Sequence, residues 1–412
     1  MRIYFDHNAT TPIDPEAAER MVQVLRDTWG NASSIHHFGQ QAKAVLDSAR
    51  ASVASLIGGD PSEVVFTAGG TDSDNIAIRG AADALEPAGR THLVTSAIEH
   101  EAVLNTMKAL GRRGWRVTVV PVDASGIVSI DRMRDAITDQ TALVSVMHAN
   151  NEIGTIQPIA DIATLAHERG ALFHTDAVQS AGKIPIDVRA LGIDLLTVAA
   201  HKFYGPKGVG ALWVKRGVRL VSPITGGRQE RSRRAGTENV PAIAGMGVAA
   251  DVARRKMASE AERQASLRDR LEAGILARVP GTERNGAAAP RVPNTTNISI
   301  DRVEAESLLI GLDLAGIAVS SGSACSSGTL EPSHVLKAMG LPHPRTLGSI
   351  RFSLGTSTTR RQAAQPDHRR QQEVACAYCR SHVGRRGFIR GRSPAARAGA
   401  RRHWCVHAAL RQ

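Results

Sequence analysis

The chain alternates short apolar runs with longer amphipathic segments as far as residue 214. Apolar runs of about four to eight residues, bounded by turn residues, are typical of strands that are buried on both faces. Strands that alternate with helices favour a mostly parallel sheet covered on both sides. The pattern predicts strands at 63–67, 92–96, 117–122, 142–148, 171–175, 195–199 and 210–214, with helices at 99–110 and 158–169 and one beginning near Thr71.

The pattern changes after residue 240, where a long Ala-rich stretch has helical spacing over 240–278. A looser stretch, 280–293, follows it. The remaining elements predict a second, smaller α+β unit: strands at 296–300, 317–320 and 349–354 and a helix at 304–314. We therefore predict an α/β protein with a large domain over 14–255, a small domain formed by 1–13 and 256–359, and an atypical tail over 360–412.

Composition supports a folded protein. The chain has 412 residues, of which 42% are hydrophobic, enough to bury a large core and too many for a disordered chain. It has no run of roughly 18 apolar residues that could span a membrane, and the first residues lack the pattern of a secretory signal. We expect a cytoplasmic protein without a membrane partner.

The net charge of +12 belongs almost entirely to the tail. Residues 360–412 contain 13 arginines, no lysine and only two acids, Asp367 and Glu373, so this segment alone carries +11. The other 359 residues carry +1, and such a balanced charge gives no support to a nucleic-acid-binding protein.

The tail has three interpretations. A disordered basic extension would normally include lysine, so we favour an out-of-frame translation of GC-rich coding sequence. In the third, Cys376 and Cys379 bind a metal with His382, His403 and Cys405, but a single Cys-x-x-Cys pair is a weak signal for such a site.

The rest of the chain contains one cysteine, Cys325. A single thiol cannot form an internal disulfide, which fits a reducing compartment. A lone cysteine is commonly a small buried hydrophobic residue. However, residues 320–328 are almost all Ser, Gly and Ala, which favours a loop that presents sulfur to a ligand and then to a partner.

Two charged residues follow predicted strands. Lys202 comes just after the strand at 195–199, and Asp176 follows the strand at 171–175. The carboxyl ends of parallel strands share one edge of a sheet, so the two side chains could meet there. A lysine and an acid at one site match pyridoxal phosphate (PLP), which needs an amine for its aldehyde and a carboxylate for its ring nitrogen. A surface lysine and a buried ion pair are the alternatives.

Two further segments fit a phosphorylated aromatic cofactor. Gly69, Gly70 and Thr71 lie between a strand and a helix, where free N–H groups and the helix dipole attract an anion. Asp72 and Asp74 follow and are expected to stabilise the helix N-terminus. His100, just after a strand, is suited to moving protons near neutral pH and can lie flat on an aromatic ring.

Taken together, these segments resemble the cysteine desulfurases, PLP enzymes of the class V aminotransferase type. The resemblance extends from Tyr4 to about Thr359, and the long Ser/Gly loop around Cys325 is similar to the group that supplies iron–sulfur scaffolds. Its motifs are FDHNATTP (5–12), GNASS (30–34), EH (99–100), NNEIG (150–154), Asp176 with Gln179, HKFYGPKG (201–208), RAGTEN (234–239), SGSAC (321–325) and RFSLG (351–355).

The resemblance implies PLP-dependent transferase fold type I and a role for each matching residue. Lys202 would hold PLP covalently, His100 would stack on its ring and move protons, and Cys325 would be the nucleophile. Cofactor contacts would come from Gly70, Thr71, Asn151, Asp176 (ring nitrogen), Gln179 (ring hydroxyl), His201 and Thr237 of a second subunit, and substrate contacts from Arg351 and Asn31.

The resemblance also implies a reaction. A homodimer would convert L-cysteine to alanine and leave a persulfide on Cys325, which then supplies an iron–sulfur scaffold or a thiolation protein. The nitrogenase, general cluster assembly and tRNA thiolation pathways all stay open as acceptors. No resident metal is implied, although Cys325 would contact a cluster iron transiently.

The chain departs from the family pattern at four places. Ala199 stands where Ser is usual, and losing this phosphate donor would cost about 1–3 kcal/mol. Ala32 replaces a usual Pro and Asp72 a usual Glu, and both changes are tolerable. The tail replaces the family's final helix after Thr359.

Two alternatives to a cysteine desulfurase follow from these observations. One is a selenocysteine lyase or another class V PLP enzyme, although the Ser/Gly setting of Cys325 argues against an aminotransferase. The other is an inactive or unstable homologue whose basic tail binds nucleic acid.

Overall fold

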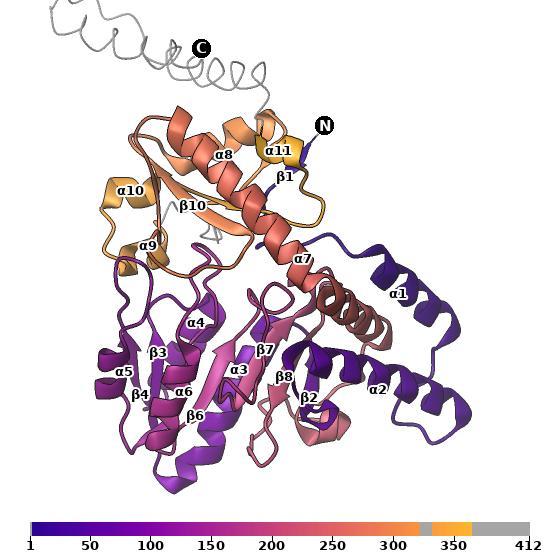
Figure 1. Cartoon of the computed structure of the whole chain (residues 1–412). Coiled ribbons are helices and arrows are strands. Elements are labelled where there is room, and N and C mark those ends of the chain that lie inside the picture. Colours follow the sequence, from indigo (N-terminus) through magenta and orange to yellow (C-terminus); the bar gives the residue numbers. More distant parts are fainter. Residues whose placement is uncertain (1, 322–331, 365–412) are drawn as a thin grey trace, which may run out of the picture.

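The computed structural model describes residues 2–321 and 332–364, and the larger part of the fold is built around a seven-stranded sheet (Figure 1). Its order is β2-β8-β7-β6-β5-β3-β4, and only β8 runs antiparallel to its neighbours. The predicted mostly parallel sheet is thus confirmed. Its strands are β2 (Val64–Thr67), β3 (His92–Ser96), β4 (Arg116–Val120), β5 (Thr141–Ser145), β6 (Leu172–Asp176), β7 (Leu195–Ala199) and β8 (Gly210–Val214).

Helices cover both faces of this sheet, and its central strands are therefore buried along their whole length. On one face, α3 and α4 contribute Ile76, Ile78 and Met107 to a hydrophobic cluster. On the other, a larger cluster joins the strands to the remaining helices. The helices of this part are α1 (Pro15–Asp27), α2 (His37–Ile57), α3 (Gly70–Leu85), α4 (Glu101–Gly111), α5 (Ile130–Ala136) and α6 (Ile159–Glu168).

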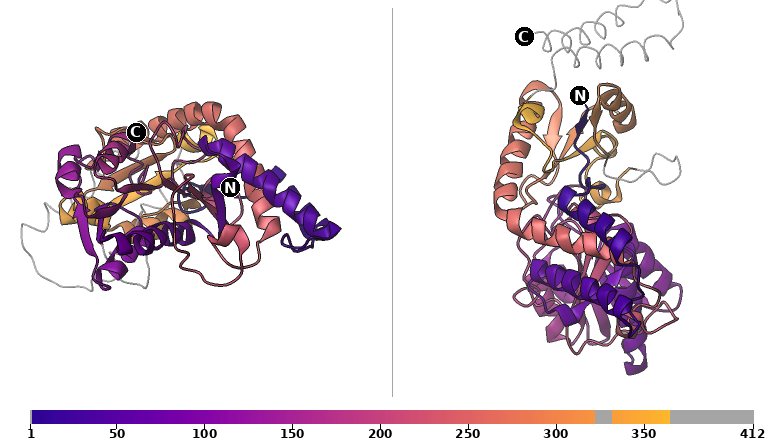
Figure 2. Two further views of the ribbon diagram at one scale, coloured as in Figure 1. Left: turned by 90° about the horizontal axis from the view of Figure 1, so that it is seen from below. Right: turned by 90° about the vertical axis from the view of Figure 1, so that its right-hand side faces the viewer.

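A smaller unit lies beside the large sheet (Figures 1 and 2). Its antiparallel sheet has the order β12-β10-β9, and β1 pairs in parallel with β11. The strands β1 and β9 are not among the predicted elements. The elements of this unit are β1 (Ile3–Tyr4), β9 (Thr282–Arg284), β10 (Thr295–Ile300), α8 (Ala305–Leu314), β11 (Ile317–Ala318), α9 (His334–Ala338), α10 (His343–Leu347), β12 (Ser349–Ser353) and α11 (Arg360–Ala364).

The helix α7 (Val240–Arg278) joins the two parts, with the bounds that the sequence predicts. Its 39 residues correspond to about 58 Å along the helix axis, which bends between the two parts (Figure 2). Its first half packs closely on α1 and α2, since a Cβ on Gly245 would lie 2.6 Å from Met21 Cγ and one on Gly247 would lie 2.7 Å from Ala49 Cα. Its second half packs on the small sheet through residues such as Leu271, so the domain boundary predicted after residue 255 falls inside one continuous helix.

The start of the predicted atypical tail is ordered. Residues Arg360–Ala364 form α11, and Ala363 is buried in the core of the small unit beside α7. A helix therefore begins after Thr359, at the position where the sequence predicts the family helix to be lost. Residues 365–412, with Cys376, Cys379 and Cys405, lie outside the described residues.

Candidate active site

Lys202 lies at the carboxyl end of β7, in the short 3-10 helix Ala200–Lys202. Its half-buried Nζ donates hydrogen bonds to the carbonyl oxygens of Asn8 (2.6 Å) and Ala9 (2.7 Å). Burial, with a smaller contribution from the charge of Arg351, lowers the pKa of Lys202 from 10.5 to about 8. Its amine is therefore far easier to deprotonate than that of an ordinary lysine, as a nucleophilic lysine requires.

Asp176 ends β6, and its pairing with Thr197 of β7 brings it to the sheet edge that carries Lys202. The carboxylate is buried, and among the described residues its hydrogen bond comes from the N–H of Val178 to Oδ1 (2.9 Å). Burial raises the pKa of Asp176, whereas the charges of His100 and Lys202 favour the ionised form. The structure thus brings together three of the predicted residues: the lysine, the acid and the histidine.

Two more buried carboxyl groups, those of Asp74 and Glu99, lie near Asp176. Burial raises the pKa of Asp74 well above its ordinary value, and the charge of Asp176 raises it further. Burial also raises the pKa of Glu99 to about 8. Three carboxyl groups so close together in a low dielectric cannot all ionise. Asp176 is the one whose ionised form is favoured by neighbouring cations, His100 and Lys202.

His100 is the N-cap of α4, and its Nδ1 accepts the N–H of Ala102 (3.1 Å). This bond leaves Nε2 to carry the ring proton. The residue before His100, Glu99, is held by α9: His334 Nε2 forms a hydrogen bond with the carbonyl oxygen of Glu99 (2.9 Å). The hydrogen bond from Ala102 therefore sets the tautomer of this exposed imidazole.

The amino end of α3 forms an anion cradle beside the end of β7. Its N-cap is Gly69, so no side chain of the N-cap residue bonds to the first N–H groups of the helix. The φ of Gly69 is +148°, a conformation that favours glycine. A Cβ on Gly70 would lie 3.1 Å from Val178 Cγ2 and 3.6 Å from Ala199 Cβ. The methyl group of Ala199 therefore points at this cradle, where the usual serine would offer a hydroxyl. Thr71 lies in the first turn of the helix and is exposed.

His201 is the neighbour of Lys202 and is fixed by the N-terminal segment. Its Nδ1 lies 3.2 Å from Thr10 Oγ1, and its carbonyl oxygen accepts the N–H and the hydroxyl of Thr11. Burial lowers the pKa of His201 to about 4, so the ring is neutral near pH 7. A neutral ring can donate one hydrogen bond to a phosphate group.

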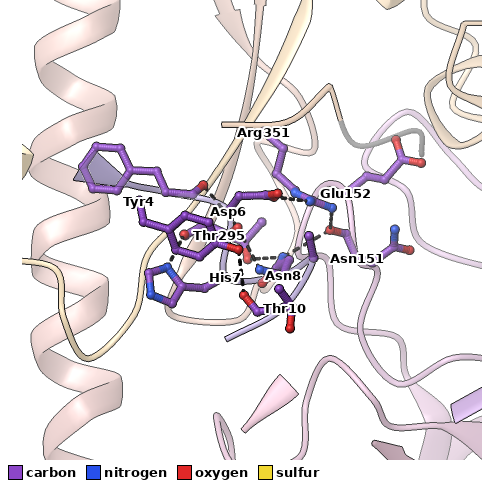
Figure 3. A network of polar contacts seen from close by, with 12 residues as sticks. Tyr4, Asp6, His7, Asn8, Thr10, Asn151, Glu152, Thr295 and Arg351 are labelled. Carbon is purple, nitrogen blue, oxygen red and sulfur yellow. Dashed lines mark hydrogen bonds and ion pairs between the residues drawn. The ribbon is translucent and has the colours of Figure 1, made fainter. Parts of the chain in front are cut away.

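Arg351 of β12 reaches the site from the small unit (Figure 3). Its Nη2 forms an ion pair with Asp6 Oδ1 (2.6 Å), and its Nη1 donates to the carbonyl oxygen of Asn151 (2.9 Å). Its Nε is buried without a partner among the described residues. The guanidinium thus retains unused N–H groups with which to bind a carboxylate.

Asn8 is hydrogen-bonded to several residues of the site, although no role was predicted for it (Figure 3). Its carbonyl oxygen accepts hydrogen bonds from Lys202 and from Gln179 Nε2 (3.0 Å). Its side-chain nitrogen donates to the carbonyl oxygen of Asn151 (3.1 Å) and to Thr295 Oγ1 (2.8 Å). The signal was present in the 5–12 motif, but the motif alone does not tell which of its polar residues lies inward.

The structure does not bring Asn31 to this point, and it does not test the predictions for Thr237, which concerns a second subunit, or for Cys325. Asn31 lies in the turn between α1 and α2, where its side chain accepts the N–H of Ser33, and no described contact joins it to Lys202 or Arg351. Thr237 is exposed on the segment before α7. Cys325 lies outside the described residues.

These residues fit PLP. The site offers a depressed-pKa amine at Lys202, a buried carboxylate at Asp176 with an oxygen free of described partners, and the uncapped, glycine-lined start of α3. Amine, carboxylate and anion cradle are the groups that the aldehyde, ring nitrogen and phosphate of this cofactor require.

The pKa of Lys202 predicts how the cofactor-free chain takes up PLP. Only the neutral amine attacks an aldehyde, so the rate of covalent loading should rise with pH and level off above about pH 8. Stopped-flow absorbance measurements from about pH 6 to about pH 10 would follow it, with butylamine as the unperturbed amine. A rate that keeps rising alongside that of butylamine would contradict the lowered pKa of Lys202.

Known proteins match nearly the whole described chain. Residues 3–365 match the aminotransferase class-V family. A cysteine desulfurase of Trichormus azollae is 50% identical over 360 residues, covering 87% of this chain and 90% of its own length. The cysteine desulfurase IscS of Dictyoglomus turgidum is 48% identical over 358 residues, covering 87% and 91%.

Solved structures agree with these relatives. A NifS-like protein superimposes with a TM-score of 0.83 at 36% identity, covering 91% of this chain and 98% of its own. The predicted fold class is therefore confirmed. The chain belongs to the cysteine desulfurases, PLP-dependent enzymes of the aminotransferase class-V family.

Proposed function

We propose that this protein removes sulfur from L-cysteine, releasing alanine and leaving a persulfide on Cys325. The observation that carries the proposal is the convergence of Lys202, Asp176 and His100 at one edge of the sheet, with Arg351 reaching toward them. The identity of about 50% to cysteine desulfurases supports the choice of substrate.

Each group of the site has a task in this reaction. PLP supplies a ring that accepts electrons from the substrate carbon. The Asp176 carboxylate holds a proton on the ring nitrogen, and the free N–H groups of Arg351 bind the substrate carboxylate. Lys202 Nζ receives and returns protons at the substrate carbons, and His100 Nε2, which carries the ring proton, donates one there.

The sulfur transfer itself falls to Cys325. Its thiolate forms a bond to the substrate sulfur while the carbon–sulfur bond of the substrate breaks. The carbon that loses sulfur gains a proton, which completes alanine. A thiol of the acceptor protein then takes the outer sulfur of the persulfide, so Cys325 is restored.

A homodimer is part of the proposal. Six large apolar side chains are exposed within residues 13–38, an unusual concentration for the surface of a monomer. Trp29 is 70% exposed and stacks on Phe38 at 4.6 Å, and Ile35 is 94% exposed. A second copy of the chain would cover this surface, and exposed Thr237 would then be available to the partner's phosphate site.

We further propose a cytoplasmic location and a sulfur-acceptor protein, of the iron–sulfur scaffold or thiolation kind. None of the described helices is both long and apolar enough to cross a bilayer. The Ser/Gly-rich sequence around Cys325 supports delivery to a protein rather than release as free sulfide.

The proposal is tested by incubating the PLP-loaded full chain with L-cysteine and a reducing thiol. Alanine and sulfide should form in equal amounts, and no 2-oxo acid should be needed. Formation of alanine only from pyruvate, with no sulfide, would indicate a transaminase instead. Activity confined to L-selenocysteine would indicate a selenocysteine lyase.

A further inference from the structure

A second lysine, Lys183, faces the site beside Lys202, and no role has been assigned to it above. It follows a tight turn in which Gly182 has a φ of +75° and lies so close to Phe203 that a Cβ would be 2.8 Å from that residue's Cβ. The turn is thereby fixed against the residue next to Lys202. The Lys183 side chain consequently enters the site from a rigid base.

The amine of Lys183 makes two hydrogen bonds inside the site. Its Nζ donates to Gln179 Oε1 (2.9 Å) and to Asn8 Oδ1 (3.1 Å). Gln179 and Asn8 are themselves buried, and the Gln179 Nε2 donates to the Asn8 carbonyl oxygen (3.0 Å). Lys183, Gln179 and Asn8 therefore form a closed ring of hydrogen bonds next to the acceptor of Lys202.

Lys183 has no carboxylate partner among the described residues, although surface lysines of this chain do form ion pairs. Its charged neighbours are the cations Lys202 and Arg351, and these, after burial itself, lower the pKa of Lys183 well below 10.5. Lys183 is half-buried, and placing an amine among cations at such a position is costly. The position of Lys183 is thus poorly explained by stability.

The amine resolves an ambiguity in the Gln179 side chain. An amide can present either its oxygen or its nitrogen to a neighbour, and the two orientations differ only in hydrogen bonding. Lys183 donates to Oε1, so the opposite orientation would place N–H groups against N–H groups. With Oε1 held, one N–H of Gln179 points at Asn8 and the other remains for a cofactor oxygen.

We propose that Lys183 is a positioning residue for the cofactor: it turns the amide nitrogen of Gln179 toward the ring hydroxyl of PLP. This inference rests on the proposed function, because it assigns the ligand of Gln179. This role requires no contact of Lys183 itself with the cofactor or the substrate.

The chain offers matched substitutions for a test. Lys183→Met keeps the aliphatic stem and removes the donors. Lys183→Arg keeps donors and charge, and its larger head can be accommodated because Lys183 lines a cavity of about 130 Å³ beside Lys202 and Met257. Gln179→Leu removes the amide that Lys183 is proposed to orient.

Two quantities should be measured on the full chain: the PLP dissociation constant, by titrating cofactor-free protein, and the unfolding temperature of that protein. Lys183→Met should weaken PLP binding about tenfold, the effect of one lost oriented hydrogen bond. The unfolding temperature should change little, because the relief of placing the amine among cations offsets the two hydrogen bonds that are lost. Lys183→Arg should restore most of the affinity.

The decisive measurement is a double-mutant cycle. In the Gln179→Leu background, Lys183→Met should cause less than about a twofold further loss of PLP affinity, because the group that it orients is already gone. Equal losses in both backgrounds, or full affinity of Lys183→Met, would overturn the inference. If the methionine variant does not fold, Lys183→Leu, which also lacks a donor, provides the same cycle.

The wild-type titration separates this inference from the proposed function. A wild-type chain that binds no PLP would overturn both. A wild-type chain that binds PLP and forms alanine, together with a Lys183→Met variant that binds it equally well, would overturn only the role of Lys183.

Discussion

Replacing Lys202 with alanine should abolish covalent PLP binding and lower the rate of alanine formation by at least about a thousandfold. The reason is positional as well as chemical. Lys202 is the one lysine at the end of β7, and its Nζ is held by two carbonyl oxygens next to the charge of Asp176. Lys183 lies close by, but its amine is already engaged with Gln179 and Asn8.

The measurement is the visible absorbance that remains after dialysis of the PLP-loaded protein, read beside alanine production. Lys108→Ala, at an exposed position of α4, is the matched control and should behave as the wild type does. Persistent absorbance in the Lys202→Ala variant, with a reducible bond to a different lysine, would assign the covalent role to that lysine.

Replacing Cys325 with serine should have an effect of the same size on sulfide release and none on cofactor binding. A serine hydroxyl is a poor nucleophile toward sulfur, so the carbon–sulfur bond of the substrate would stay intact. The variant should keep the absorbance of bound PLP and still change it when L-cysteine is added. Cys405→Ser, in the tail, controls for loss of a thiol.

Comparison of sequence and structure shows where pattern analysis succeeds. The strands at 195–199 and 210–214 have the predicted bounds, because every residue in each of them is buried. The helix at 240–278 also has the predicted bounds, and its N-cap, Asn239, marks its start. The strand predicted at 117–122 ends earlier, at Val120, since the apolar run continues into a loop in which Val122 pairs with Val128.

The polar centre of the site could be predicted only in part. Neighbouring parallel strands brought Asp176 and Lys202 to one edge, as the strand order requires. Two contacts of the site join residues more than 280 positions apart: Asn8 with Thr295 and Asp6 with Arg351. Such pairings depend on how the small unit packs on the large sheet, which periodicity does not encode.

Ala199 shows the same difference between what the sequence can identify and what only the structure can explain. The sequence identifies the missing hydroxyl by comparison with a family motif, but the structure shows why the loss is local. The Ala199 methyl group lies beside Gly70, so the amide groups at the start of α3 keep their positions.

The central claim is that the amine of Lys202, the carboxylate of Asp176 and the thiol of Cys325 act on one cofactor. Mass spectrometry of the PLP-loaded protein after brief exposure to L-cysteine, without reductant, tests it most directly. The peptide that contains Cys325 should gain the mass of one sulfur atom while an equal amount of alanine forms, and neither should occur in Lys202→Ala. Alanine formed with an unmodified Cys325 peptide would contradict the claim.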